Sequence, residues 1–388
     1  MKRINIAFFI VFIFIYTVLN YFLGVRGKKF FTKAFPVVDH KVYWVLFWII
    51  AFSYVISRIG VKILPTKIHY FFTLLGSYWI ACIVYLLMLI VVMDVIVFCS
   101  RILGFISKEG INDTRFIIGK GLFVIIVLIV ILVYGTINAK RPIVNTYNIE
   151  INKVSDHSRS IHAVLISDIH LGDIIDNKRL EEMVSKINEI EPEIVFIAGD
   201  IIDSDINPFI TNKMGETFKK LNPPLGVYAV LGNHDYYGGR IEEVVSNLEK
   251  CGINVLRDDY VNIDNRFYVI GREDIALEMT SHKKRKVLGE ITGEIDKSLP
   301  LILLDHQPRN LNEAMEEGVD LQLSGHTHKG QFFPNHFITK IIFEIDYGIL
   351  KKEDFHVVVS SGYGTWGPPI RVMNQSEIVE LFIHFKTF

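Results

Sequence analysis

Ala163-Val164-Leu165-Ile166-Ser167-Asp168-Ile169-His170-Leu171-Gly172 is the stretch that decides the fold of the second half of this 388-residue chain. An apolar run over residues 163–166 is followed at once by polar side chains and a glycine, which is typical of a buried strand that ends in a loop. Apolar runs bounded by turn residues recur at 194–198, 227–231 and 301–304. These runs predict buried strands of an α/β domain.

Amphipathic helices are predicted between the strands, because apolar residues recur there at helical spacing. The three sets are Leu180, Met183, Val184, Ile187 and Ile190; Ile241, Val244, Val245 and Leu248; and Leu311, Ala314 and Met315. Gly252 and Gly318 follow the second and third sets and are suitable helix stops. Further strands are expected at 267–270, 321–323, 357–360 and 378–385. About nine strands and at least three helices indicate layered sheets flanked by helices.

Four short polar signatures and one lone histidine follow the predicted strands. They are Asp168-Ile169-His170, Gly199-Asp200, Gly232-Asn233-His234-Asp235 and Gly325-His326-Thr327-His328, with His306 between the last two. Strand-end loops are where the ligand sites of α/β sheets gather, because the strands hold the loop bases rigidly. We therefore expect these side chains to converge on one rim of the domain.

The converging side chains form a ligand set for two divalent metal ions. The candidate ligands are Asp168, His170, Asp200, Asn233, His306, His326 and His328. Carboxylate, carboxamide and imidazole groups suit Mn, Fe or Zn, and a shared carboxylate can bridge a pair of ions. Asp200 is the best candidate for the bridge, because Gly199 lets the backbone approach closely.

A pair of ions about 3.5–4 Å apart is a general device for in-line displacement at phosphorus. Water held between the ions would lose its proton near neutral pH, and the metal-bridging hydroxide is the expected nucleophile. His234 is then free to act as the general acid that protonates the leaving group. Asp203 is a candidate to orient that imidazole. The sequence thus predicts a phosphoesterase.

Each signature has a less specific interpretation when it is taken alone. Gly-Asn-His-Asp could be a turn, Gly-His-Thr-His could bind one structural zinc, and Gly-Asp is uninformative. The joint occurrence of all of them at strand ends favours the metal site. The remaining histidines are expected to be surface or structural residues, and Asp173, Asp176 and Asp235 to be cap or loop residues. Motifs of zinc proteases, serine hydrolases and P-loop proteins are absent from the sequence.

The first 141 residues predict a membrane domain of four transmembrane helices. Apolar stretches at 4–23, 42–61, 71–98 and 116–134 reach the roughly 20 residues needed to cross a bilayer. Buried soluble helices and, for the first stretch, a cleaved signal peptide are the alternatives. Aromatic residues near the span ends favour the membrane interface: Tyr43, Trp44, Trp48, Tyr78 and Trp79. We expect an integral protein of the cell membrane.

Four spans would place the N-terminus and the second domain on the same side of the membrane. Basic residues near the membrane are similar in number on the two sides, so the positive-inside rule separates them little. The dense basic loop from Arg26 to Lys33 favours a catalytic domain outside the cytoplasm. Its cations are interpreted as orientation determinants or lipid-headgroup contacts. The formal net charge of −1 gives no reason to expect a nucleic-acid partner.

Asp94 is an acidic residue inside the third stretch, and such residues are functional candidates. Its place near the end of a long run would also let it reach the interface. A transporter-like role for the spans is the alternative to a plain anchor, but they carry little polarity otherwise. The three cysteines show no disulfide or metal-binding spacing, and the sequence does not determine the oligomeric state.

The five signature blocks resemble those of the calcineurin-like metallophosphoesterase superfamily over roughly residues 160–385. The resemblance implies an α/β/β/α sandwich of two mixed sheets. It also implies one metal held by Asp168, His170 and His328, another by Asn233, His306 and His326, and Asp200 bridging them. His234 matches the catalytic histidine of the family, and Asp203 matches the aspartate that partners it in some members.

Three phrases look similar to a branch of membrane-associated bacterial phosphodiesterases and the related transmembrane protein with metallophosphoesterase domain. They are Ser167-Asp168-Ile169-His170-Leu171-Gly172, Gly325-His326-Thr327-His328-Lys329-Gly330-Gln331 and Ser361-Gly362-Tyr363-Gly364-Thr365. Lys329 departs from the glycine that is common in that branch and adds a cation near the predicted metals. Some members of the branch act on UDP-2,3-diacylglucosamine.

The expected domains are a membrane domain at 1–141, a linker and edge strand at 142–160 and the phosphoesterase domain at 161–388. The leading hypothesis is a membrane-anchored dimetal phosphoesterase that hydrolyses a phosphodiester, a phosphomonoester or a pyrophosphate, with a lipid-linked ester as one candidate substrate. The alternative is a catalytically silent membrane scaffold or sensor with structural metals. A complete ligand set and an intact His234 favour the enzyme.

Overall fold

The computed structural model describes residues 2–61, 63–155, 160–281 and 283–386. The chain divides into two compact units: Met1–Tyr134 with Gly367–Pro369, and Gly135–Trp366 with Ile370–Phe388. The boundary at residue 134 falls inside a helix, so the residue limits of the two domains stay a prediction.

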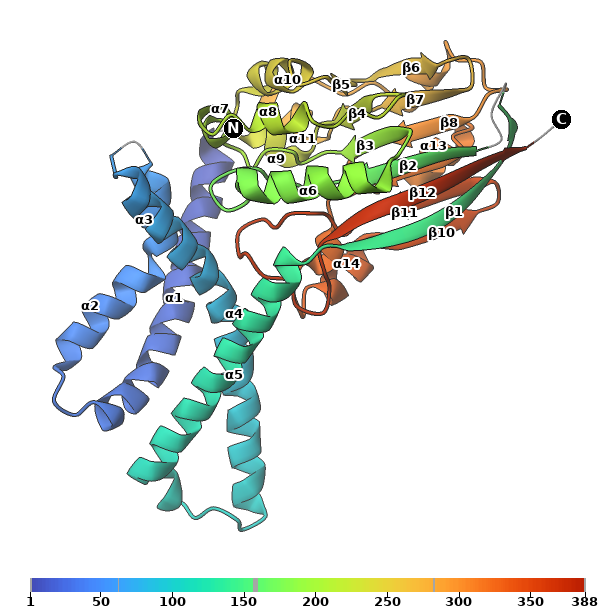
Figure 1. The fold of residues 1–388 in the computed structure, drawn as a ribbon. Helices are drawn as coiled ribbons and strands as arrows, with labels where there is room; N and C mark the ends of the chain where they lie inside the picture. The colour runs from blue at the N-terminus through green and yellow to red at the C-terminus, as the bar shows by residue number, and fades with distance from the viewer. Residues whose placement is uncertain (1, 62, 156–159, 282, 387–388) are drawn as a thin grey trace. The chain divides into compact units, whose positions relative to one another are not determined.

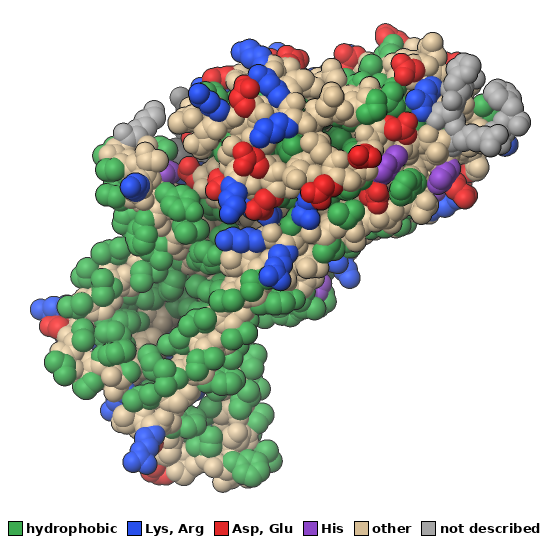
Figure 2. All heavy atoms as spheres, viewed as in Figure 1, with side chains coloured by type: hydrophobic (Ala, Val, Ile, Leu, Met, Phe, Trp, Pro, Cys, Tyr) green, Lys and Arg blue, Asp and Glu red, His purple; other side chains and the backbone are tan. Residues whose placement is uncertain are grey.

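The first unit is helical (Figure 1). Its elements are α1 (Lys2–Ala34), α2 (His40–Ala51), α3 (Ser53–Gly60), α4 (Thr66–Ile102), the 3-10 helix η1 (Gly110–Asn112) and most of α5 (Thr114–Lys140). Three segments are long and apolar enough to cross a membrane: Ile10–Ala34, Thr66–Ile102 and Thr114–Lys140. Figure 2 shows hydrophobic side chains over much of the visible face of these helices. The expectation of N-terminal apolar helices is confirmed.

The four-helix count is not confirmed, because the second predicted span is broken. α2 and α3 are bent by 55° and make a fourth span only if the pair crosses as one. The Ser53 hydroxyl donates to the carbonyl of Ile50 at 2.6 Å, and the Ser57 hydroxyl donates to Tyr54 at 2.8 Å. Serine hydroxyls compete with the backbone in this way and often bend helices.

The predicted basic loop after the first span is helical instead. α1 continues to Ala34, so Arg26, Lys28 and Lys29 lie on its last turns. Lysine and arginine are good helix formers, and Pro36 is the first residue after them that cannot continue a helix.

The second unit contains two mixed sheets, as expected (Figure 1), and within the described residues each has six strands, more than the about nine predicted in all. The first sheet has, in spatial order, β1 (Ile143–Val154), β12 (Glu377–Lys386), β2 (Ser160–Ile166), β3 (Ile194–Ala198), β4 (Val227–Val230) and β5 (Ile253–Val255). The second has β10 (Gly348–Lys352), β11 (Phe355–Val359), β9 (Leu321–Ser324), β8 (Leu301–Leu304), β7 (Phe267–Gly271) and β6 (Asp259–Ile263).

Parallel pairing at the centre of both sheets positions the strand ends together. β2 to β5 are parallel, and so are β7, β8, β9 and β11. β12 is antiparallel to β2, and β6 and β10 pair antiparallel with their neighbours. The carboxyl ends of the central strands in each sheet therefore share one edge.

Three apolar clusters hold these layers. One cluster joins the facing sides of the two sheets and includes Phe196 of β3 and Leu323 of β9, both fully buried. A second packs the first sheet against helices, among them α6 (Asn177–Ile190), α8 (Met214–Phe218) and α10 (Ile241–Glu249). A third packs the second sheet against α12 (Leu288–Thr292) and α13 (Leu311–Glu316). The remaining short helices are α7 (Asn207–Thr211), α9 (Asn233–Tyr237), α11 (Ala276–Ser281), η2 (His328–Gly330) and α14 (His336–Ile342).

The last residues of α5 belong to this second unit and are hydrogen bonded within it. Arg179 donates to the carbonyls of Lys140 and Ala139 at 2.7 and 3.0 Å. The Ser376 hydroxyl also donates to Ala139 at 2.9 Å, and the Arg371 amide donates to the Gly135 carbonyl at 2.8 Å. The last four carbonyls of a helix lack intrahelical partners, and the donors to Ala139 and Lys140 satisfy two of them.

Candidate metal centre

The candidate ligands lie in loops that directly follow the central strands. Asp168 follows β2, Asp200 follows β3, and Asn233 opens α9 just after β4. His306 follows β8, and the two histidines of Gly325-His326-Thr327-His328 follow β9. The convergence predicted from the strand ends is thus present in the structure.

Backbone hydrogen bonds tie these loops to one another. The amide of Asp168 donates to the Gly199 carbonyl at 2.9 Å, and that of His170 donates to Asp200 at 3.0 Å. The amide of Gly325 donates to the His306 carbonyl at 2.9 Å. Ligand atoms held by paired backbone cannot separate without breaking buried hydrogen bonds.

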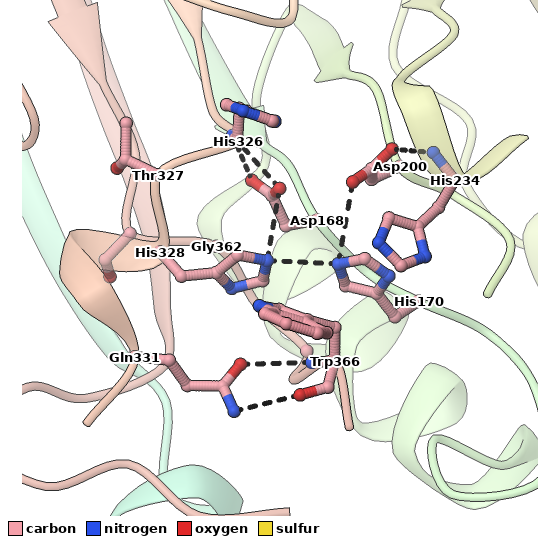
Figure 3. Close-up of polar contacts among 12 residues, drawn as sticks. Asp168, His170, Asp200, His234, His326, Thr327, His328, Gln331, Gly362 and Trp366 are labelled. Carbon is pink, nitrogen blue, oxygen red and sulfur yellow. Dashed lines mark hydrogen bonds and ion pairs between the residues drawn. The ribbon is translucent and has the colours of Figure 1, made fainter. Parts of the chain in front are cut away.

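One group of possible metal ligands consists of Asp168, His170 and His328, all of them buried (Figure 3). The Nε2 atoms of the two histidines lie 3.0 Å apart, and His328 Nε2 lies 3.4 Å from Asp168 Oδ1. Both carboxylate oxygens of Asp168 accept from the amide of His326 at 3.0 Å. Two ring nitrogens and a carboxylate that face one point can hold a divalent ion.

A second group consists of Asp200, His306 and His326. Oδ2 of Asp200 lies 3.4 Å from His306 Nε2 and 3.7 Å from Nε2 of His170. The same carboxylate oxygen therefore lies near both groups, as a bridging ligand must. Its other oxygen accepts from the amide of His234 at 2.8 Å, which fixes the carboxylate orientation.

Several buried atoms at the site have no protein hydrogen-bond partner. Asn233 Oδ1 is enclosed without a hydrogen bond, and His306 Nε2 makes none either, although Asp200 Oδ2 lies 3.4 Å away; Nδ1 of His306 lies 2.7 Å from the Ala198 carbonyl. A ring nitrogen bound to a backbone carbonyl leaves the other nitrogen free to ligate a metal. An unsatisfied buried acceptor costs about 1–3 kcal/mol, so a bond from Asn233 Oδ1 to a cation would explain that atom. The residues therefore fit divalent metal ions.

Two glycines allow the loops to approach this closely. A Cβ at Gly199 would lie 2.6 Å from Nδ1 of His306, and one at Gly232 would lie 2.2 Å from Oδ1 of Asp200. Gly199 also has φ of +85°, a conformation that favours glycine. The glycines of these two signatures are thus required by the packing of the ligands.

The candidate ligands themselves adopt strained backbone. Asp168, His170, Asp200, His326 and His328 have φ between 49° and 70°. Non-glycine residues in this region each cost on the order of 1–3 kcal/mol, and they cluster at functional sites. The strained φ values are consistent with loops whose backbone conformation directs these side chains into the site at a cost in local backbone energy.

Burial sets the protonation of the site. Desolvation lowers the pKa of His170 to about 4 and that of His326 to about 3, so both rings are neutral near pH 7. Burial raises the pKa of Asp168 to about 6. Burial also opposes the ionisation of Asp200, but the positive charge of His306 outweighs it and holds the pKa of that carboxyl well below its ordinary value.

We expect metal binding to weaken below about pH 6, because protons and metal ions compete for the Asp168 carboxylate, whose pKa in the metal-free protein is raised to about 6. Above that pH the carboxylate is ionised and free to bind; below it the ion that Asp168 holds must displace a proton from this carboxyl. His170, with a pKa near 4, adds no loss in this range, whereas the proton on His306, whose pKa is raised well above 6.5, must also leave when a metal binds and adds a loss of its own. The affinity for Mn²⁺, measured by titration calorimetry on metal-stripped protein, should fall by at least about tenfold per pH unit below pH 6. An affinity that stays constant down to about pH 5 would contradict the assignment of Asp168 as a ligand.

His234 lies beside the ligand groups and is paired with a carboxylate. Its Nδ1 lies 3.1 Å from Asp203 Oδ1 and 3.5 Å from the Ser204 hydroxyl. Burial alone would lower the pKa of His234, but the hydrogen bond to Asp203 and the charges of Asp200 and Asp203 outweigh it and raise the pKa. His234, Asp203 and His170 also form a third group of possible ligands. Because Asp203 already binds the ring nitrogen, an acid–base pair is the better description.

Asp235 is more than a loop residue. Its buried carboxylate accepts from the amides of Gly232, Ile201 and Ile202 at 2.8, 3.3 and 2.8 Å. It thereby joins the loop that carries Asp200 to the loop that carries Asn233. The sequence placed Asp235 inside a signature, but hydrogen bonding to distant amides leaves no pattern that could have revealed this role.

Arg371 is the main residue that the sequence did not indicate. Its fully buried guanidinium donates to the carbonyls of Gly362 and Gly364 at 2.9 and 2.7 Å and lies 3.4 Å from Nδ1 of His328. Asn374 supports the same loop by donating to the His328 carbonyl at 2.7 Å. Both are positioning residues behind a candidate ligand, and no spacing in the sequence singles them out.

Two further side chains define the surroundings of the site. The Nζ of Lys329 lies 4.0 Å from the centre of the Tyr347 ring, so its charge is engaged by an aromatic face. Gln331 and Trp366 exchange two hydrogen bonds of 3.1 and 3.0 Å, and the half-exposed Trp366 ring lies 6.2 Å from that of His234 (Figure 3). An exposed ring beside the candidate acid can contact a leaving group.

Comparisons with known proteins agree with this geometry. The family model described as calcineurin-like phosphoesterase matches residues 161–330. An uncharacterized metallophosphoesterase of Aquifex aeolicus is 36% identical over 246 residues, which cover 63% of this chain and 92% of that protein. The chain belongs to the calcineurin-like metallophosphoesterase family. It is a metal-dependent phosphoesterase.

Two further matches share less sequence identity with this metallophosphoesterase. A transmembrane protein with metallophosphoesterase domain from Danio rerio is 30% identical over 276 residues, covering 67% of this chain and 61% of the relative. A solved dimetal phosphatase from Danio rerio matches with 12% identity and a TM-score of 0.34, over 52% of this chain and 88% of that one. The apolar helices of the metallophosphoesterase indicate that it associates with a membrane.

Proposed function

We propose that the chain is a membrane-anchored phosphoesterase that holds two divalent ions and hydrolyses a phosphoester or pyrophosphate bond of a lipid-linked substrate. The observation that carries the proposal is the position of Asp200, whose Oδ2 lies within 3.7 Å of a ring nitrogen from each ligand group. Two groups joined by one carboxylate are the arrangement expected of a dimetal centre.

In this proposal Asp168, His170 and His328 hold one ion, and Asp200 contributes to both. The second ion is held by Asn233 Oδ1 and His306 Nε2 together with His326. Bound divalent ions would lower the pKa of a water molecule and stabilise negative charge on the phosphoryl oxygens. The ions are Mn, Fe or Zn, since imidazole and carboxylate ligands suit each of them.

His234 supplies the proton that the leaving-group oxygen needs. Its ring is held by Asp203 at Nδ1, which leaves Nε2 as the atom that can donate to substrate. The raised pKa of His234 favours the protonated ring, which a general acid requires. Asp203 acts on substrate only through this imidazole and is therefore a positioning residue.

A lipid-linked substrate is supported by the apolar helices. An enzyme tethered to a bilayer meets esters in the same bilayer at a higher effective concentration than soluble esters. UDP-2,3-diacylglucosamine is a candidate of this chemistry, because it combines a pyrophosphate with acyl chains. A catalytically silent scaffold is not favoured, because the ligand groups and His234 are all in place.

A substrate panel on the detergent-solubilised full-length protein tests the proposal. We expect Mn²⁺-dependent hydrolysis of bis-p-nitrophenyl phosphate, and at least about tenfold higher kcat/KM for a lipid-linked pyrophosphate than for the same headgroup without acyl chains. Chelator-treated protein should be inactive and should recover when Mn²⁺ is returned. Equal rates with and without acyl chains would contradict the lipid linkage, whereas no hydrolysis of any ester would contradict the catalytic assignment.

A further inference from the structure

The helical unit contains a cavity of about 450 Å³ that the proposed reaction does not use. Residues from α1, α2, α4 and α5 line it, and most of them are apolar, such as Leu23, Phe47, Ile90 and Leu128. This volume lies in the range of small-molecule binding sites. In a membrane-associated chain the available apolar occupant is the hydrocarbon part of a lipid.

Three charged side chains from three helices meet at the wall of this cavity. Arg26 of α1 places Nη2 2.7 Å from Oδ2 of Asp94 on α4, and Lys120 of α5 places Nζ 3.3 Å from Oδ1 of the same carboxylate. Two cations therefore share one anion, which leaves an excess positive charge. Lys29 also lines the cavity and adds to the excess. Asp94 is thus part of a charge cluster rather than an isolated intramembrane acid.

The cluster lies well inside its helices. Arg26 and Asp94 each precede the last residue of their helix by eight positions, and Lys120 follows the start of α5 by six. At 1.5 Å per residue these distances are about 9–12 Å along the helix axes. Charged side chains within candidate membrane spans are commonly functional. All three side chains remain about one third or more exposed, so they can accept a further polar partner.

We propose that this cavity binds one anionic phospholipid of the surrounding bilayer. The phosphate contacts Arg26 and Lys120, and part of the acyl chains occupies the apolar wall formed by residues such as Ile90 and Leu128. The excess positive charge selects an anionic headgroup over a zwitterionic one. Inorganic phosphate would satisfy the cations but would leave the apolar cavity unfilled. Every residue involved belongs to the helical unit, so the proposal is independent of the proposed catalytic function.

Native mass spectrometry of the full-length protein tests this proposal. The protein is placed in nanodiscs of phosphatidylcholine and phosphatidylglycerol in equal parts, and the lipid retained after release is identified. The parent protein should retain one phosphatidylglycerol. Arg26→Gln with Lys120→Gln should retain roughly tenfold less of it. The matched control is Lys33→Gln with Arg115→Gln, which removes the same charge from the same two helices outside the cavity lining and should retain lipid as the parent does.

Asp94→Asn separates lipid binding from a merely structural ion cluster. It leaves both cations in place and removes their internal anion, so retention of phosphatidylglycerol should increase. If the three charges serve only to hold the helices together, Asp94→Asn should lower retention or leave it unchanged, and either result overturns the proposal. Equal retention of phosphatidylcholine by the parent, or displacement of bound lipid by inorganic phosphate, overturns it as well. The Asp94→Asn result decides the matter even if the double variant fails to fold.

Discussion

Replacing Asp200 with asparagine is expected to lower kcat for bis-p-nitrophenyl phosphate by about a thousandfold or more. The substitution keeps the shape of the side chain and removes the negative charge that lies 3.4 Å from His306 and 3.7 Å from His170. Without this charge the two ligand groups lose their shared anion, and neighbouring cations are no longer compensated. Kinetic assays with Mn²⁺ and elemental analysis of the purified protein measure both effects.

The control for this prediction is Asp259→Asn, an identical change at an exposed position on β6. It should leave activity and metal content unchanged. An Asp200→Asn protein that keeps two metal ions and most of the parental kcat would show that Asp200 does not connect the two groups. Loss of folding would be visible in its thermal unfolding and would require the metal content to be measured on the folded fraction.

Replacing His234 with glutamine is expected to lower kcat by about a hundredfold to ten-thousandfold while metal content stays unchanged. Its ring is held by Asp203 rather than by the groups that contain Asp168 or His306. A general acid matters most when the leaving group is a poor one, so the loss should be larger for an alkyl ester than for a p-nitrophenyl ester. The dependence of the loss on the leaving group is the decisive measurement.

His384→Gln, at an exposed position on β12, is the matched control and should behave as the parent. An equal loss for all leaving groups would assign His234 to transition-state stabilisation instead of proton donation. A loss of one metal ion in His234→Gln would instead favour the third ligand group formed with His170 and Asp203. Asp203→Asn should reproduce the leaving-group dependence more weakly, because it acts through the ring.

The central strands could be predicted from the sequence, whereas three of the four outermost ones in the described residues could not. Runs such as residues 194–198 are buried on both faces and are therefore continuous in hydrophobicity. β5, β6 and β10 were missed, and each is the last strand at an edge of its sheet. One face of an edge strand is often partly solvated, so its sequence mixes polar and apolar residues and lacks a clear signal. In the helical unit, the bend between α2 and α3 at Phe52 lies beside a serine hydroxyl that bonds to the backbone. Hydrophobic periodicity in the sequence does not reveal such a bond.

The candidate ligands could be predicted because few side chains can bind a transition metal, and the glycines beside them mark close backbone approach. His306 stood alone in the sequence, yet its place after β8 was enough to include it. Arg371 and Asp235 could not be predicted, since they act on backbone groups rather than on recognisable side chains. Every residue has a backbone carbonyl, and all but proline have an amide N–H. The partner of such a side chain can therefore be almost any residue type, and the pairing is visible only in the structure.

The attachment of Ala139 and Lys140 to Arg179 has a practical consequence for truncation. A water-soluble fragment cut at Pro142, where the hydropathy suggests a natural boundary, would remove two acceptors of a guanidinium that is only 8% exposed. It would also remove the acceptor of the Arg371 amide, in the segment that lies behind His328. The catalytic unit therefore begins inside a hydrophobic helix, and its integrity depends on residues that a trimmed version would discard.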